Sequence, residues 1–466
     1  MLKLRDQDRS DAGGAGGEPA TGRRTTTDER LVRQLEGLSE ADDDYWTFRR
    51  GAARRQAQGL TQYPAMMVPP MQAVLLGVVA KVLGRLRAVL DPFAGSGTTL
   101  VECMRLGLDY AGQDINPLAV LFCRAKAGPF HTARLVSAVN DVVNRASLDR
   151  GRRVEADFPG LEKWFSSEAA AELSRIRRAI RRVDHVWCRR VLWTGLAETV
   201  RLTGNSRTST FKLHIRSPDE LRSRTVNPLE TFTDILADIT ERLQQEAVAL
   251  NKAGHLSANG WYRGDVLLRL GDSAELVPPT PSGHDLLVTS PPYGDNTSTV
   301  PYGQYSYLPL QWIDLEDIDE EADSSYLRST YEIDTRSLGG SRKHAVRDIQ
   351  HLLPVSPSLK KTLRRLAELP VDRAGRVAAF CRDLDSSLRP VLEALRPSAY
   401  MIWTVGNRRV GAKPVPTDTI LAELLAAKGV RLVTRIKRKI PNKRMATRNA
   451  IASTMRGETV LVFRKA

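Results

Sequence analysis

Short apolar segments alternate with helix-like segments along two parts of this 466-residue chain, and this alternation restricts the fold more than any other feature. Strands that alternate with helices are typical of a mostly parallel sheet with helices on its faces. The sequence therefore predicts an α/β fold with a seven-stranded Rossmann-like sheet, its last two strands close enough in sequence for a hairpin. The expected strands lie near 88–93, 110–115, 266–270, 285–289, 400–405, 431–437 and 459–463.

Two long interruptions break this alternation and divide the chain. Both exceed an ordinary connection within a domain, so we interpret them as large insertions into the sheet domain. A tail rich in Gly, Arg, Thr and Asp is expected to be disordered, because it has little to bury. Pro390 is expected to break or kink the helix that leads to the fifth strand. The predicted divisions are a tail (1–40), three pieces of the sheet domain (41–130, 261–296 and 371–466), a largely helical insertion (131–260) and a second insertion (297–370).

The charge balance favours a polyanionic partner. The chain has 69 Lys and Arg against 54 Asp and Glu, a formal net charge of +15, although a basic proteome would give the same bias. No run approaches the roughly 18 apolar residues of a membrane span, and the N-terminus lacks the apolar core of a signal peptide. We therefore expect a cytoplasmic protein with no membrane segment. The cysteines form no CxxC pair, which argues against zinc and disulfides: Cys103, Cys123, Cys188 and Cys381.

A glycine-rich turn over residues 91–98 joins the first strand to its helix. Glycines there allow a tight turn and a close approach of a ligand, and the helix start offers N–H groups. A P-loop would need Lys where Thr98 stands, and a dinucleotide fingerprint would need Gly where Leu100 stands. A loop for an uncharged or zwitterionic ligand remains, with a purely structural turn as the alternative. Asp114, at the end of the second strand, is suitably placed for both hydroxyls of a ribose.

These residues resemble the amino-methyltransferases of DNA. That family's pattern DPFxGSGT, followed by an acidic Asp-Ile-Asn, is found here at 91–98 and 114–116. The resemblance implies S-adenosylmethionine as cofactor, with Asp91 at the methionine ammonium, Asp114 at the ribose and Asp272 at the adenine amine. It also implies that the segment beginning at Tyr63 closes over the methionine end. The implied cofactor-binding residues are Asp91, Phe93, Gly95, Ser96, Gly97, Thr98, Asp114, Asp272 and Tyr63.

The catalytic candidates Ser290, Pro291, Pro292 and Tyr293 follow the apolar strand near 285–289. An exocyclic amine conjugated to its ring is a poor nucleophile, and it improves when acceptors hold its hydrogens. The Ser290 hydroxyl and the Pro291 carbonyl can do this, because two prolines fix the chain. Tyr293 offers a π face to a base that has left the duplex stack. A proline-rich turn without function is the alternative.

This motif resembles the Ser-Pro-Pro-Tyr type, which in the family more often methylates cytosine N4, whereas Asp-Pro-Pro-Tyr more often methylates adenine N6. The resemblance therefore implies a site-specific methyltransferase of double-stranded DNA, cytosine N4 being expected and adenine N6 the alternative. Cytosine C5 chemistry is excluded, because it needs a thiolate and no cysteine follows a proline. RNA or protein-amide methylation and a non-enzymatic DNA-binding role remain open. No nuclease motif is present, so any cognate restriction or defence nuclease would be a separate partner.

Basic segments suggest where DNA is bound, and we expect residues 131–260 to carry much of the target recognition. That insertion also contains the polar, donor-rich stretch 205–212. The aromatic and amide side chains of 294–307 could stack on bases or pack a loop, and both readings stay open. A predicted phosphate-binding helix face carries Arg175, Arg177, Arg178, Arg181, Arg182, Arg189 and Arg190, and a second basic run carries Arg435, Lys437, Arg438, Lys439, Lys443 and Arg444.

Overall fold

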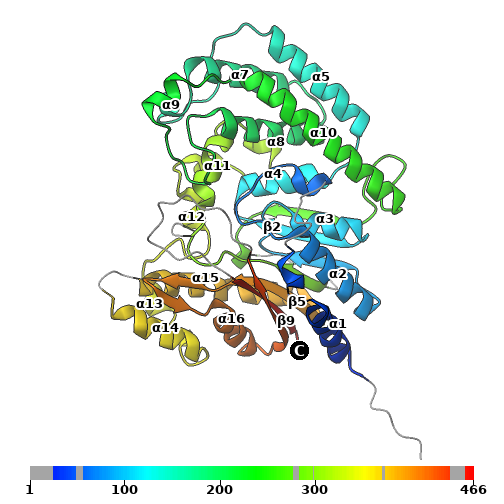
Figure 1. The fold of residues 1–466 in the computed structure, drawn as a ribbon, viewed down its shortest axis with the longest axis vertical. Helices are drawn as coiled ribbons and strands as arrows, with labels where there is room; N and C mark the ends of the chain where they lie inside the picture. The colour runs from blue at the N-terminus through cyan, green and yellow to red at the C-terminus, as the bar shows by residue number, and fades with distance from the viewer. Residues whose placement is uncertain are drawn as a thin grey trace, which may run out of the picture.

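A seven-stranded sheet forms the centre of the computed structural model, which describes residues 25–42, 44–48, 56–275, 283–296, 299–369, 373–440 and 457–466 (Figure 1). The strand order is β3-β2-β1-β4-β5-β9-β8. Neighbouring strands pair in parallel from β3 to β5, whereas β9 is antiparallel to β5 and β8. The expected Rossmann-like α/β fold is confirmed. The strands are β1 (Ala88–Asp91), β2 (Asp109–Asp114), β3 (Val266–Leu270), β4 (His284–Thr289), β5 (Leu395–Gly406), β8 (Arg431–Lys439) and β9 (Gly457–Arg464).

Both faces of the sheet are buried. Successive strand residues point to opposite cores: Val89 and Leu286 join one core, and Leu90 and Leu287 join the other. Helices α2 (Pro69–Leu83), α3 (Thr98–Arg105) and α4 (Pro117–Lys126) contribute to the first core. Helices α15 (Ala374–Glu393) and α16 (Thr417–Ala426) contribute to the second. Because helices cover both faces, the carboxyl ends of the parallel strands are the part of the sheet domain left to form a site.

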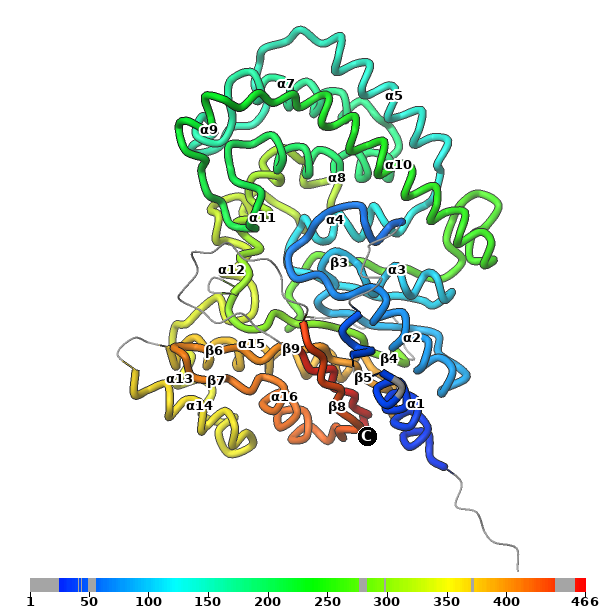
Figure 2. Tube along the Cα trace, in the orientation of Figure 1, coloured from blue at the N-terminus to red at the C-terminus, as the bar shows by residue number. Residues whose placement is uncertain are grey.

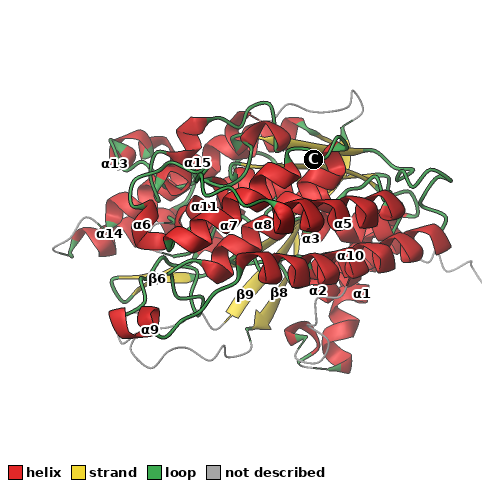
Figure 3. Cartoon of the chain, turned by 90° about the horizontal axis from the view of Figure 1, so that it is seen from above, coloured by secondary structure: helices red, strands yellow, loops and turns green. Residues whose placement is uncertain are grey.

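The segment of residues 131–260 contains six helices in the described structure and extends the first core away from the sheet (Figure 1). Its helices run across the molecule when it is seen from above (Figure 3). The Trp187 indole donates to the carbonyl of Ala125 in α4 at 3.0 Å, which ties the insertion to the sheet domain. Its helices are α5 (Thr132–Leu148), α6 (Leu161–Trp164), α7 (Ser167–Ile180), α8 (Val186–Thr203), α9 (Pro218–Arg222) and α10 (Pro228–Lys252).

The second insertion runs from the helical insertion, where α11 packs on α8, to the opposite face of the sheet, where α13 and α14 pack on α15 (Figure 2). It therefore passes along the carboxyl edge of the sheet. Its elements are α11 (Tyr302–Leu310), α12 (Glu332–Arg336), α13 (Ala345–Asp348), α14 (Pro357–Ala367) and the 3₁₀ turns η4 (Leu315–Asp317), η5 (Ser324–Leu327) and η6 (Gln350–Leu352). Other 3₁₀ turns are η1 (Tyr45–Thr47), η2 (Gln56–Gly59) and η3 (Ser273–Glu275).

The prediction of a disordered tail over 1–40 is wrong for its last part, because α1 spans Thr27–Ala41. Thr26 and Glu29 form a reciprocal capping box at its start. Leu31 and Leu35 are buried, and the Asp28 carboxylate accepts hydrogen bonds from Tyr400, Arg431 and Arg464. A short polar helix is thus held by a few tertiary contacts. Residues 1–24 lie outside the described residues.

The expected break at Pro390 is also wrong. Helix α15 continues through Pro390 to Glu393, because Leu388 and Val391 on either side are buried in the second core. A small hairpin of β6 (Arg408–Val410) and β7 (Lys413–Val415) was not predicted. Within the ranges given above, no helix is long and apolar enough to cross a membrane.

Candidate functional site

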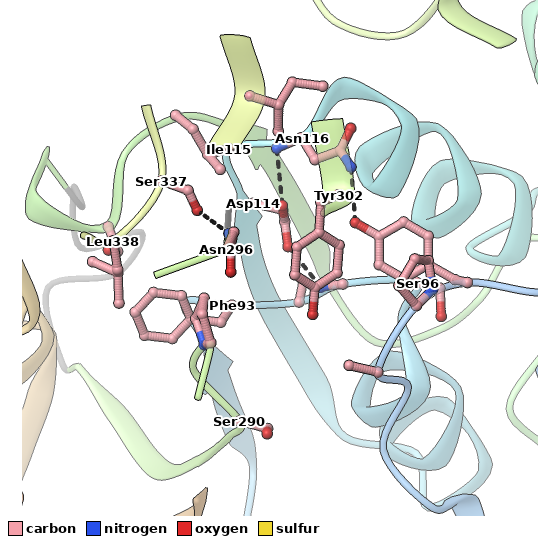
Figure 4. A pocket seen from close by; sticks show the side chains of 18 of the residues that line it. Phe93, Ser96, Asp114, Ile115, Asn116, Ser290, Asn296, Tyr302, Ser337 and Leu338 are labelled. Atoms are coloured by element: carbon pink, nitrogen blue, oxygen red, sulfur yellow. Dashed lines mark hydrogen bonds between the residues drawn. The ribbon is translucent and has the colours of Figure 1, made fainter. Parts of the chain in front are cut away.

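A pocket that opens to solvent lies at the carboxyl ends of β1, β2 and β4 (Figure 4). Apolar side chains and a few polar groups converge on it, as in small-molecule sites. Most of the residues that the sequence predicted for the site contribute to its wall, and Asp91, Gly97, Pro291 and Tyr293 do not. The predicted residues that line it are Tyr63, Phe93, Gly95, Ser96, Thr98, Asp114, Asp272, Ser290 and Pro292.

The turn between β1 and α3 is shaped by two glycines with left-handed backbone conformation, Gly95 at φ +52° and Gly97 at φ +80°. At Gly97 a Cβ atom would lie 3.0 Å from the Cys123 sulfur, so space as well as conformation favours glycine. The Lys126 ammonium, on a fully buried side chain, donates to the Ser96 carbonyl at 2.6 Å. Helix α4 therefore contacts one side of the turn, and the other side of the turn faces the cavity.

Asp114 fixes this turn to the end of β2. One carboxylate oxygen accepts from the Gly95 N–H at 2.8 Å and the other from the Asn116 N–H at 2.9 Å (Figure 4). Burial raises the Asp114 pKa to about 6, and these backbone hydrogen bonds oppose the increase. Each oxygen keeps lone pairs for further donors, so the carboxylate can accept the two hydroxyls of a ribose.

Asp91 lies beneath the turn and is fully buried. Its Oδ1 accepts from the Thr289 hydroxyl at 2.6 Å, and its Oδ2 has no hydrogen-bond partner among the described residues. Burial raises the Asp91 pKa to about 7. The Ser96 hydroxyl is likewise buried without such a partner. Unsatisfied polar groups around a glycine turn fit a ligand that carries an ammonium and a carboxylate, as S-adenosylmethionine does.

Asn116 joins the N-terminal segment to the site, and the sequence reasoning assigned it no role. Its amide nitrogen donates to the Tyr63 hydroxyl at 2.9 Å and to the Ser306 hydroxyl at 2.8 Å, while its oxygen caps α4 at Leu118. The Tyr63 ring contacts Tyr302, with centroids 5.6 Å apart. The aromatic stretch within 294–307 therefore has side chains in both kinds of position. Tyr302 lines the cavity, and Tyr305 is buried in the core.

The catalytic motif follows β4. The Ser290 hydroxyl donates to the Thr404 carbonyl on β5 at 3.0 Å, so its lone pairs remain available to accept. Tyr293 does not line the cavity, and its hydroxyl donates to Glu458 at 2.8 Å. Glu458 in turn accepts from Arg438 at 2.6 Å. The hydroxyl of Tyr293 therefore has a structural partner on β9, and the stacking role of its ring stays a prediction.

The comparisons with known proteins agree with these features. A family model described as DNA methylase, of the N6/N4 type, matches residues 27–121. The chain is also 29% identical to the Type II methyltransferase M.MvaI of Kocuria varians, over 94% of this chain and 97% of that protein. The family model and this relative together support an amino-methyltransferase family of the N6/N4 DNA methylase type for the chain. The methylase uses S-adenosylmethionine as its methyl donor.

Two further likenesses are weaker. The methylase is 39% identical to the Type II methyltransferase M.MjaII of Methanocaldococcus jannaschii, over only 12% of this chain and 11% of that protein. The solved structure of the rRNA methyltransferase aviRa from Streptomyces viridochromogenes is similar with a TM-score of 0.28 and 13% identity, covering 90% of this chain and 96% of that one. A likeness this low supports no statement about substrate.

The predicted phosphate-binding face on α7 and α8 is wrong for most of its arginines, because acidic groups within the methylase neutralise them. Arg177 and Arg181 pair with Asp314 at 2.9 and 2.6 Å, and Arg189 pairs with Asp317 at 2.6 Å. Arg178 pairs with Asp149 and Glu155, and Arg190 donates to the Asp317 carbonyl. The contacts with Asp314 and Asp317 join the helical insertion to the second insertion, whereas those of Arg178 lie within the helical insertion. Counting charges along the sequence could not reveal Asp314 and Asp317 as partners, because they lie more than a hundred residues from these arginines.

Two other basic or polar segments stay close to the cavity. Arg435, Lys437 and Lys439 alternate with buried residues on the edge strand β8 and are exposed. Because β8 runs parallel to β5, its last residues lie at the same edge of the sheet as the cavity. The polar stretch 205–212 approaches α11, where Phe211 contacts the Tyr305 ring, with centroids 5.7 Å apart. Lys443 and Arg444 lie outside the described residues.

Replacement of Asp114 by Asn is expected to weaken S-adenosylmethionine binding by about 10- to 100-fold, the usual range for a lost hydrogen bond to a charged group. In the wild type the affinity should also fall as the pH drops below about 6, because protonation removes the ionised acceptor. Isothermal titration calorimetry between pH 5.5 and 8 measures both effects. Asp109→Asn, at the other end of β2, is the control and should bind normally. Equal pH dependence in wild type and Asp114→Asn would remove Asp114 from the site.

Proposed function

We propose that this methylase transfers a methyl group to the exocyclic amine of a flipped base in double-stranded DNA, with cytosine N4 as the target. One observation carries the proposal. Ser290 lies on the wall of the cavity that also contains the glycine turn and Asp114, and its hydroxyl proton is engaged by the Thr404 carbonyl. The hydroxyl oxygen is thereby oriented as an acceptor for an amine hydrogen.

The chain supplies positioning rather than a titrating base. Ser290, together with the Pro291 carbonyl, would hold the amine hydrogens and favour a pyramidal nitrogen. Asp114, Asp272 and the turn around Ser96 would hold the cofactor. Bound S-adenosylmethionine would supply an electrophilic methyl group to the amine nitrogen; its sulfur would keep the electron pair of the broken C–S bond, and one amine proton would pass to solvent.

A duplex bound at this edge would meet cations and polar groups from two directions. The exposed row Arg435, Lys437 and Lys439 on β8 is suited to phosphates, and the stretch 205–212 is suited to base edges. We propose that residues 131–260 contribute target recognition through this stretch rather than through the paired arginines of α7 and α8. Cytoplasmic location and a separate cognate nuclease belong to the same proposal, supported by the likeness to a Type II methyltransferase.

The preference for cytosine over adenine comes from the resemblance to the Ser-Pro-Pro-Tyr type and from the neutral hydroxyl of Ser290. Tyr302 also lines the cavity, and its ring would leave less room there, which would suit a smaller pyrimidine.

The expected product of DNA methylated in vitro is N4-methylcytosine. Digestion to nucleosides followed by mass spectrometry identifies the methylated base directly, and S-adenosylmethionine without enzyme is the control. N6-methyladenine as the sole product would reject the choice of base and keep the reaction class. Absence of any methylated nucleoside, with methyl transfer to RNA or protein instead, would reject DNA as the substrate.

A further inference from the structure

Asn296 follows the catalytic motif and lies deep in the cavity wall. Asn296 is only 2% exposed to solvent. The amide nitrogen donates to the Ser337 hydroxyl at 2.5 Å, whereas the amide oxygen is buried with no hydrogen-bond partner among the described residues. Figure 4 shows the nitrogen toward Ser337 and the oxygen directed away from it.

The segments on both sides hold this side chain in place. Asp295 forms a buried ion pair with Arg408 at 2.8 Å. Gly339, at φ +79°, packs so closely on Asp295 that a Cβ atom there would lie 3.2 Å from the Asp295 Cβ, and its N–H donates to Asp383 at 2.8 Å. These contacts restrain the chain next to Asn296 and near Ser337.

A buried acceptor without a donor is unfavourable, so such a group in a native protein calls for an explanation, and a donor on a bound ligand is one. The neighbouring side chains Phe93, Ile333 and Leu338 are apolar and suit the faces of a flat ring. An acceptor in the wall of a cavity that these apolar side chains also line matches a heteroaromatic ring that carries an amino group.

We propose that the Asn296 amide oxygen accepts a hydrogen bond from the exocyclic amine of a heteroaromatic ring bound in the cavity. The inference rests on the proposed function, in which two rings of this chemistry bind: the adenine of the cofactor and the target base. Ser337 is a positioning residue, because it holds the amide nitrogen and turns the oxygen toward the ring.

Two nearly isosteric variants test the inference. Asn296→Leu removes the acceptor, and Asn296→Asp keeps one that can still pair with the Ser337 hydroxyl. Calorimetry measures the affinity for S-adenosylhomocysteine and tests a hydrogen bond to the cofactor; this is the cofactor arm. The value of kcat/KM on DNA with saturating cofactor tests a hydrogen bond to the target base; this is the target arm. Thermal unfolding verifies the fold, and Asn296→Ala replaces the Leu variant if Leu does not fit.

We expect the Leu variant to lose about 10- to 100-fold in one arm and the Asp variant to retain most of that arm. Loss of S-adenosylhomocysteine affinity assigns the amine to the cofactor, and loss of kcat/KM alone assigns it to the target base. Wild-type values for the Leu variant in both arms, or equal losses for Leu and Asp, would overturn the inference. A wild-type chain that binds S-adenosylhomocysteine but does not methylate DNA would reject the proposed function instead, and the cofactor arm would still test Asn296.

Discussion

Ser290→Ala is expected to lower the rate of methyl transfer by about 100-fold, the magnitude seen when one preorganised hydrogen-bonding group is removed from an active site. The variant loses the hydroxyl oxygen that the Thr404 carbonyl orients as an acceptor, so the target amine stays planar and conjugated with its ring. Activity should not disappear, because the Pro291 carbonyl remains. Single-turnover methylation of DNA at saturating cofactor measures the effect on the chemical step.

The affinity for S-adenosylmethionine separates the catalytic role of Ser290 from a role in cofactor binding. We expect this affinity to stay within about twofold of the wild-type value, since Asp114 and the glycine turn are unchanged. Ser387→Ala is the matched control, because Ser387 is a fully buried serine in α15 that does not line the cavity. A normal rate combined with weakened cofactor binding would place Ser290 in the cofactor site and contradict the proposed mechanism.

Arg408→Met is expected to destabilise the methylase by about 3–5 kcal/mol, because it leaves the Asp295 carboxylate buried without its cation. Both side chains of this pair are almost completely buried, 6% and 3% exposed. The guanidinium also lies against Gly294, where a Cβ atom would come within 2.2 Å of it. The pair therefore shapes the loop after the catalytic motif, and activity should fall together with stability.

A double-mutant cycle with Asp295→Asn checks the ion pair. Arg408→Met combined with Asp295→Asn should recover part of the loss, because the uncompensated charge is gone. Chemical denaturation measures all three variants, and Arg389→Met, in an exposed pair with Glu393, should leave stability nearly unchanged. A loss below about 1 kcal/mol for Arg408→Met would mean that water reaches Asp295 and that the loop is open.

Residues next to strand ends were predictable from sequence. The turn at Gly95 and Gly97, the acid Asp114 and the motif at Ser290 are local patterns, and parallel strands bring their carboxyl ends to one edge. Asn116 had a partial signal, since it precedes Pro117 at a helix start. Its hydrogen bonds to Tyr63 and Ser306 were not predictable, because they depend on how distant segments pack.

The wall supplied by the second insertion had no sequence signal. Arg336, Ser337 and Leu338 line the cavity from a segment of short helices and turns without a strong period or a motif. Asn296 lies in the stretch 294–307, for which the sequence could not distinguish contacts to bases from packing within a loop. Its significance follows from the tertiary contacts with Ser337 and from the unsatisfied oxygen, and neither feature can be seen in the order of residues.

The ion pairs between the two insertions bear on how this architecture can diversify. Asp314 and Asp317 are mostly buried and depend on arginines of α7 and α8 for their neutralisation. Replacing residues 131–260 alone with the segment of another methylase would leave the Asp314 and Asp317 carboxylates buried without their cations, unless that segment has the same arginines. If residues 131–260 carry target recognition, as we propose, the unit exchanged for a new target is larger than one contiguous segment and includes Asp314 and η4, which ends at Asp317. Recombination or engineering that exchanges both parts together would keep the cavity wall attached to the segment proposed to select the DNA sequence.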